Sequence, residues 1–196
     1  MAVSSQKKVM PDAGSLASAA RKAASKGPAP VHLWDPEFCG DLDMRIARDG
    51  TWFYLGTPIG RKPLVKLFSS IIRRDGDAYF LVTPVEKVGI TVDDAPFVAV
   101  DFDVSGSGNS QEIVFLTNVD DRVTAGPDHP IRLEHDPKTG EPSPYLLVRN
   151  NLEALIDRKS FYRLVDIGCT ETFADENWFG IRSDGQFFPL IRQAEL

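Results

Sequence analysis

Residues 61–68 read Arg-Lys-Pro-Leu-Val-Lys-Leu-Phe, and residues 158–165 read Arg-Lys-Ser-Phe-Tyr-Arg-Leu-Val. All positions except the third agree in identity or in chemical type. Pro63 suits the first turn of a helix, and apolar side chains follow it at helical spacing. The first stretch therefore predicts a helix buried along a broad face. The echo predicts a second, related helix in the C-terminal half of the chain.

Hairpins are predicted on both sides of each helix. Asp49-Gly50 separates two apolar stretches, as in a tight two-residue turn, and the pattern recurs at Asp75-Gly76 and Asp184-Gly185. Both helices thus follow one hairpin and precede another. The sequence predicts an α+β protein built from two related hairpin-helix-hairpin units, with a ligand cleft between the copies.

A β-rich stretch is expected to join the two units. Apolar side chains alternate with polar ones over residues 85–133, and the short connections favour antiparallel strands. Arg132–Glu134 and Tyr145–Val148 predict another hairpin. The capping-box spacing of Asn150 and Glu153 predicts a helix through Ile156. The expected boundaries give a leader over 1–30, an N-terminal unit over 31–84 and a C-terminal unit over 85–196.

The leader is basic, whereas the rest of the chain is acidic. Five Lys or Arg residues face one carboxylate, Asp12, in residues 1–30, whereas the 196-residue chain carries a net charge of −6. A short helix is expected over Ser15–Lys26, with Asp12 or Ser15 as its N-cap and Gly27 just past its end. It is either a basic arm for an acidic partner or membrane, or a leader docked loosely on the body. The acidic body disfavours binding to a nucleic-acid polymer.

Composition argues against a membrane-spanning, secreted or metal-binding protein. The chain has two Cys, three scattered His and no apolar run of membrane-spanning length. No secretory signal, metal site or cofactor is expected, and the protein is predicted to be cytoplasmic with reduced cysteines. The oligomeric state is left open.

The chain also resembles a bacterial family known as domain of unknown function 1285. The resemblance is carried by residues 34–52, by Gly60–Ile71, by Leu81-Val82-Thr83-Pro84-Val85-Glu86-Lys87-Val88 and by Asp94–Val98, and it spans roughly 31–193. It implies a duplicated α+β core whose C-terminal half is pleckstrin-homology-like. It further implies a pocket for a nucleotide-like ligand at the domain interface and a role in signalling.

An anion site is the leading candidate for a functional site. Gly56–Lys62 places a glycine-containing loop before a helix start, but its spacing and Pro63 exclude a P-loop. Arg61, Lys62 and Lys87 would neutralise phosphate, Trp52 and Tyr54 would stack on a base, and Arg158 and Lys159 would be the counterparts in the second copy. Alternatively, the cations are solvated at a turn and the aromatic side chains fill the interface between the halves.

The sequence offers weaker support for two other types of site. Asp101, Asp103, Ser105-Gly106 and Glu112 match the spacing of an EF-hand calcium loop, although the flanking pattern predicts a β-hairpin instead. Carboxylate doublets could support a hydrolase or transferase, but no catalytic motif accompanies them. We therefore expect a non-catalytic module that binds a small anionic, nucleotide-like ligand between two duplicated halves. The alternatives are a protein–protein adaptor and, less favoured, an enzyme.

Overall fold

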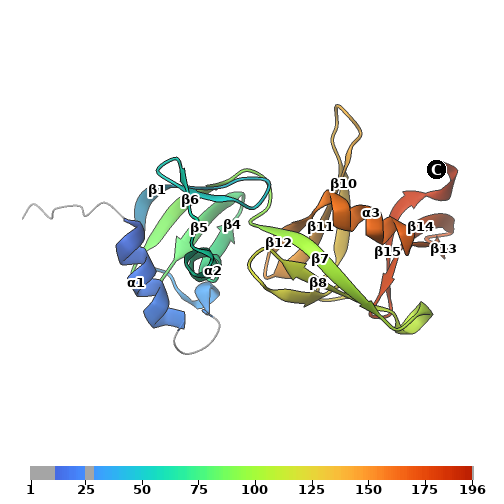
Figure 1. The fold of residues 1–196 in the computed structure, drawn as a ribbon, viewed down its shortest axis with the longest axis horizontal. Helices are drawn as coiled ribbons and strands as arrows, with labels where there is room; N and C mark the ends of the chain where they lie inside the picture. The colour runs from blue at the N-terminus through green and yellow to red at the C-terminus, as the bar shows by residue number, and fades with distance from the viewer. Residues whose placement is uncertain (1–11, 25–28, 196) are drawn as a thin grey trace, which may run out of the picture. The chain divides into compact units, whose positions relative to one another are not determined.

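The computed structural model describes residues 12–24 and 29–195, and its chain divides into two compact units (Figure 1). Unit 1 contains the chain through Ala47 and Thr51–Asp93, whereas unit 2 contains Arg48–Gly50 and the chain from Asp94 onward. The boundary lies beyond the expected one after residue 84, because strand β6 (Lys87–Val92) completes the sheet of unit 1. The expected helix end at Gly27 lies outside the described residues.

A six-stranded sheet forms unit 1. Its strands lie in the order β3-β2-β1-β6-β5-β4. The predicted hairpin at Asp49-Gly50 is confirmed, because Ile46 pairs with Trp52 across the β1–β2 turn. The other strands and the helices of this unit are α1 (Ala13–Ala24), β1 (Phe38–Ile46), β2 (Trp52–Tyr54), β3 (Thr57–Pro58), α2 (Lys62–Ser69), β4 (Ile72–Asp75) and β5 (Ala78–Val82), with a short 3-10 turn, η1, at Val31–Leu33.

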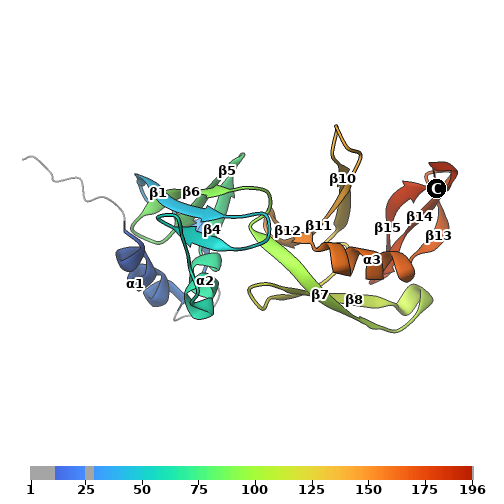
Figure 2. The same ribbon diagram turned by 45° about the horizontal axis from the view of Figure 1, so that its top comes forward.

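Helices cover one face of this sheet. Leu42, Met44 and Ile46 are buried, while the residues between them on β1 are exposed, so only one side of the strand faces the core. Figure 2 shows α1 and α2 on the same side of the sheet. On α1, Leu16 and Ala20 are fully buried. The basic helix of the leader is therefore packed into unit 1 through the small apolar stripe that the sequence carries.

A second six-stranded sheet, followed by a three-stranded one, forms unit 2. Its order is β10-β11-β12-β7-β8-β9, and β13-β14-β15 form the smaller sheet. The elements are β7 (Phe97–Ser105), η2 (Gly108–Ser110), β8 (Glu112–Thr117), β9 (Arg122–Thr124), β10 (Ile131–His135), β11 (Pro142–Arg149), β12 (Leu152–Ile156), α3 (Arg158–Asp166), β13 (Cys169–Phe173), β14 (Glu176–Ser183), β15 (Gln186–Arg192) and η3 (Gln193–Glu195). The predicted hairpins β10–β11 and β14–β15 are confirmed.

The two six-stranded sheets share one topology. Each consists of two antiparallel three-stranded meanders, joined at the centre by a parallel pair of the first and last strands. The duplication is therefore visible in the sheets. However, α2 connects the third and fourth strands of the first sheet, whereas α3 follows the sixth strand of the second. The two helices of the sequence echo occupy different positions in the two copies.

Two expectations about the strands are corrected. The helix expected from Asn150 to Ile156 is strand β12, in which Leu152, Ala154 and Ile156 are buried at the period of a strand. Asn150 has φ +50° and sits in the tight β11–β12 turn, a conformation that Asn tolerates better than most residues. The expectation of antiparallel strands over residues 85–133 holds for β7, β8 and β9, but β6 and β7 also pair in parallel with β1 and β12, which lie outside that stretch. The chain between the two parallel strands of each pair runs through the four other strands of that sheet, with α2 among them in unit 1.

Candidate functional site

The start of α2 is exposed and lacks a side-chain cap. A tight turn at Leu55-Gly56, both with positive φ, connects β2 to β3, and the chain then reaches the helix. Arg61 is the N-cap residue, with φ −89° and ψ 94°, but its side chain accepts no capping hydrogen bond. Arginine carries only donors, so it cannot satisfy the free N–H groups at a helix start.

The backbone at this helix start offers an anion few donors. Pro63 has no N–H group, and the N–H groups of Leu64 and Val65 donate to the carbonyl oxygen of Arg61 at 2.9 and 3.1 Å. The usual attraction of a helix N-terminus for phosphate is therefore weak in this case. Any attraction must come mainly from cationic side chains.

Three cationic side chains line a hollow at this position. Arg61 and Lys62 lie at the start of α2, and Arg21 comes from the last turn of α1. The hollow measures about 560 Å³ and is otherwise lined by Gly60, Pro63, Leu64 and Leu67. No carboxylate of the described residues lies within ion-pair distance of these three side chains. The structure thus brings together the predicted pair and a third cation.

Arg21 is the residue that the sequence interpretation missed. The sequence places it in a basic leader, either an arm for a partner or a helix docked loosely on the body, without assigning it to a site. A helix with Leu16 and Ala20 on its packing face places Arg21 beside that face, on the same helix turn as Ala20. Helical spacing could therefore have predicted its position next to α2.

The tryptophan expected to stack on a ligand lies in the core instead. Trp52 is 1% exposed, and its ring stacks on that of Phe68 with centroids 6.3 Å apart. Its indole nitrogen is buried without a hydrogen-bond partner among the described residues. Tyr54, two residues along β2, is half-buried. Trp52 therefore has no free face for a base and serves the packing of α2 on the sheet.

Lys87 is neutralised within the sheet. Its Nζ lies 2.6 Å from a carboxylate oxygen of Asp75 and 4.0 Å from the centroid of the Phe80 ring. Asp75 also accepts a hydrogen bond from Arg73. Burial opposes ionisation of Asp75, but the hydrogen bonds from Lys87 and Arg73 outweigh it and lower the pKa of that carboxyl. Lys87 is thus committed to a partner away from the hollow of Arg61.

The second predicted cation pair lies at a capped helix start. Arg158 forms an ion pair with Glu141 at 3.2 Å, and Lys159 is exposed beside it. The carboxylate of Asp157 accepts the N–H of Ser160 at 2.7 Å. A negative group therefore already occupies the place that an anion would take at the start of α3. The two helix starts share a sequence but differ in charge.

The calcium-loop spacing corresponds to a hairpin. Ser105 pairs with Glu112 across the β7–β8 connection, and Asp101 and Asp103 form ion pairs with Arg163 and Arg122. The hydrogen bond from Arg163, aided by the N–H of Phe102, lowers the pKa of Asp101. Within 12–24 and 29–195, no group of three or more His, Cys, Asp or Glu side chains could hold a metal ion.

None of the helices in the described part of the chain is long and apolar enough to cross a membrane.

Comparisons with known proteins agree with this architecture. A family model described as "Domain of unknown function (DUF1285), N-terminal domain" matches residues 29–95, and one described as "Protein of unknown function (DUF1285), C-terminal domain" matches residues 96–190. No curated protein matches the chain.

Two solved structures are similar over most of their length. A DUF1285 family protein from Silicibacter pomeroyi DSS-3 is 62% identical, with 92% of this chain and 96% of that chain covered and a TM-score of 0.83. A DUF1285 family protein from Shewanella baltica OS155 is 30% identical, with 64% and 91% covered and a TM-score of 0.52. Since the two matched regions together span both six-stranded sheets, the chain belongs to the DUF1285 family.

Proposed function

We propose that this protein is a non-catalytic module that binds a small, multiply charged anion, such as a nucleotide-like phosphate compound, in the hollow of Arg21, Arg61 and Lys62. The proposal is carried by one observation: these three cationic side chains, from two helices, line the same hollow, and no carboxylate of the described residues lies within ion-pair distance of them. Guanidinium groups bind two phosphate oxygens at once, and an ammonium group adds a point charge.

The charge pattern around the hollow favours a small anion. Most arginines described elsewhere form ion pairs, including Arg45 with Asp93 at 2.5 Å and Arg132 with Glu153 at 2.5 Å. Three neighbouring cations without such partners repel one another, which a di- or triphosphate would relieve. The net charge of −6 over the chain would repel an extended polyanion while still allowing local binding of a small one.

Other parts of the expectation stay predictions. The proposal places the ligand within unit 1 and involves no site between the units. The signalling role and the pleckstrin-homology likeness of the C-terminal half, which the family resemblance implied, stay predictions as well.

Thermal unfolding with added anions tests the proposal. Pyrophosphate and nucleoside mono-, di- and triphosphates are added to the full chain at millimolar concentration and constant ionic strength. At a ligand concentration one hundred times Kd, binding stabilises the folded state by about 2.7 kcal/mol. For a chain of this size the melting temperature should then rise by roughly 5–10 °C.

Charge-removing variants locate the site. We expect Arg61→Gln, Lys62→Gln and Arg21→Gln each to weaken pyrophosphate binding by about tenfold or more, because each removes a charge-assisted contact. Lys159→Gln is the matched control, because it removes an exposed cation from the equivalent sequence position in the first turn of α3. Equal affinity in the triple variant and the unmodified chain, or no stabilisation by any of these anions, would rule the proposal out.

A further inference from the structure

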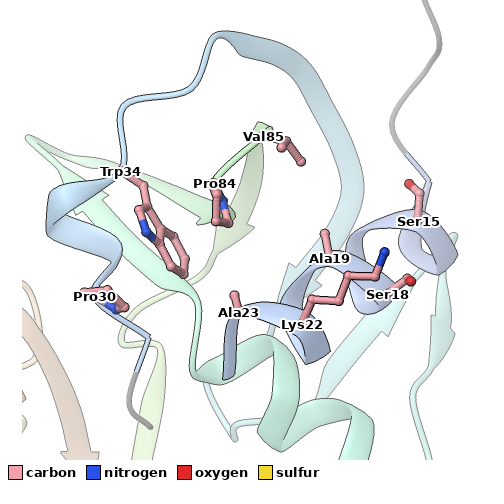
Figure 3. A pocket seen from close by; sticks show the side chains of 9 residues that line it. All are labelled: Ser15, Ser18, Ala19, Lys22, Ala23, Pro30, Trp34, Pro84 and Val85. Atoms are coloured by element: carbon pink, nitrogen blue, oxygen red, sulfur yellow. The ribbon is translucent and has the colours of Figure 1, made fainter. Parts of the chain in front are cut away.

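A larger, mostly apolar pocket lies on another side of α1. It measures about 780 Å³, within the range of small-molecule sites, and belongs entirely to unit 1. Figure 3 shows Trp34 and Pro84 on one wall and α1 on the other. No residue of the anion hollow lines this pocket, and neither does any residue that the sequence predicted to bind a ligand, so the pocket calls for its own explanation.

The wall that carries Pro84 and Val85 is held rigidly. Thr83 is fully buried, and its hydroxyl oxygen accepts the N–H groups of Val85 and Glu86 at 3.4 and 3.2 Å. The N–H of Thr83 in turn donates to the carbonyl of Glu86 at 2.9 Å. This tight turn presents Val85 with 74% of its surface exposed. The apolar tip is thus fixed in place and is not a product of a loose loop.

The aromatic wall is also anchored from below. The guanidinium of Arg73 donates to the carbonyl oxygens of Trp34 at 2.6 Å and of Val31 at 3.2 Å. Val31 is 4% exposed, so this anchor reaches into the core. The ring of Trp34 is half-buried and faces the pocket near Pro30 and Pro84 (Figure 3). A preorganised apolar wall of this kind lowers the entropy cost of binding.

The opposite wall gives the pocket one sign of charge. Lys22 is the one charged side chain among the described residues that line it, and it lies beside Ser18 and Ala19 on α1 (Figure 3). Two serine hydroxyls, from Ser15 and Ser18, supply the remaining side-chain polarity apart from the indole N–H. Flat proline and indole faces favour a planar apolar group, and a lysine in the lining favours one negative charge on the ligand.

We infer that this pocket binds a small molecule with a planar apolar body and a single anionic group. The planar body lies between Trp34 and the Pro84-Val85 tip, and the anionic group lies toward Lys22. Such a ligand differs from that of the anion hollow, because its affinity comes mainly from apolar burial and only one charge takes part. The inference therefore does not depend on the function proposed for Arg61 and Lys62.

Two fluorescent probes test the inference with the full chain. The dye 1-anilinonaphthalene-8-sulfonate carries a planar body and one sulfonate, whereas dansylamide carries a planar body without a negative charge. We expect one-to-one binding of the sulfonate dye. Trp34→Ala should weaken it by about tenfold because a large stacking face is lost. Ala23→Leu should weaken it at least as much, because the added side chain fills the pocket from α1.

Lys22→Met tests whether the ammonium group of Lys22 contributes to binding of the sulfonate. This variant should weaken the sulfonate dye about three- to tenfold and leave dansylamide unchanged, while Lys138→Met, which removes an exposed cation from the β10–β11 turn, should change neither. Every variant must retain the cooperative thermal transition of the unmodified chain, since partly unfolded proteins also bind this dye.

Three results would overturn the inference. They are equal dye affinity in Ala23→Leu and the unmodified chain, equal loss of both dyes in Lys22→Met, and dye binding that changes with self-association of the chain. The last result would assign the pocket to contact with a second copy. Pyrophosphate binding that survives Trp34→Ala would leave the anion hollow intact whichever way the dye experiment falls.

Discussion

Replacing Arg61 by aspartate should stabilise the protein while weakening its affinity for anions. Arg61 has the extended backbone of an N-cap residue but accepts no capping hydrogen bond. Asp157 occupies the corresponding place before α3, and its carboxylate accepts the N–H of Ser160 at 2.7 Å. Arg61→Asp therefore transfers the cap of α3 to α2. The residue that suits the helix and the residue that suits an anion are different.

The expected gain can be worked from the local geometry. A good N-cap side chain contributes about 1 kcal/mol, and a carboxylate at a helix N-terminus adds about 0.3–1 kcal/mol. The cap has one donor within reach, the N–H of Leu64, which it must share with the Arg61 carbonyl at 2.9 Å, because Pro63 has none. We therefore expect a net gain of about 1 kcal/mol, or a rise of roughly 2–4 °C in melting temperature.

Urea denaturation of the full chain measures this gain. Unfolding of unit 1 is followed by the fluorescence of its Trp34 and Trp52 in a Trp178→Phe background, which removes the signal of unit 2. The series Arg61→Ala, Arg61→Asn and Arg61→Asp separates removal of the cation, addition of a cap and addition of a negative charge. Stability should rise along the series, with the largest step at Asn. The reverse exchange, Asp157→Arg, should cost about 1–2 kcal/mol in unit 2.

A particular outcome would refute the reasoning. If Arg61→Asp left the urea midpoint unchanged or lowered it, the start of α2 would not be an uncapped helix end of the kind described. If instead the variant were stabilised but bound pyrophosphate as tightly as the unmodified chain, the cap argument would stand. The anion site would then lie elsewhere.

Two further changes test other parts of the structure. Burial, aided by repulsion from Asp12, raises the pKa of Glu86 above its value in the unfolded chain, so the ionised carboxylate destabilises the folded state at pH 7. Glu86→Gln should therefore raise the melting temperature at pH 7, and this gain should disappear below about pH 4, where Glu86 is protonated in both states. Glu112→Gln, on an exposed site, should have little effect at either pH. A Cβ on Gly180 would lie 2.3 Å from a carbonyl oxygen of the neighbouring strand β15, so Gly180→Ala should cost about 2–4 kcal/mol in urea denaturation, against less than about 0.5 kcal/mol for Gly60→Ala, whose Cβ meets nothing within 4 Å; similar values for both would contradict the packing of β14 on β15.

The sequence predicts the features that depend on neighbouring residues. Asp49-Gly50 supplies the backbone angles of a tight turn, and Pro63 marks a helix start, so both the first hairpin and α2 are found where expected. The duplication is also detected, although the two helices with similar sequences occupy different positions relative to the strands of the two repeated sheets. Short-range chemistry specifies these elements before any tertiary contact is made.

Features that depend on distant partners escape the same reasoning. Asn150 and Glu153 have the spacing of a helix cap, but pairing with β11 and β7 makes the following residues a strand. Alternation of Leu152 and Ala154 was the competing signal, and it prevails because the sheet buries one side of the strand. Long-range pairing also determines which cations are free to bind a ligand. Lys87 is not, because it forms an ion pair with Asp75 on another strand.

The central parallel pair of each six-stranded sheet bears on how the protein is made and how it can be rearranged. Ile46 of β1 pairs with Val92 of β6, so the first meander emerging from the ribosome waits for the end of its unit before its sheet is complete. Pairings so distant in sequence slow folding. The first and last strands of each sheet are neighbours but run parallel, so a circular permutant of a single unit would need a linker as long as a strand to join them.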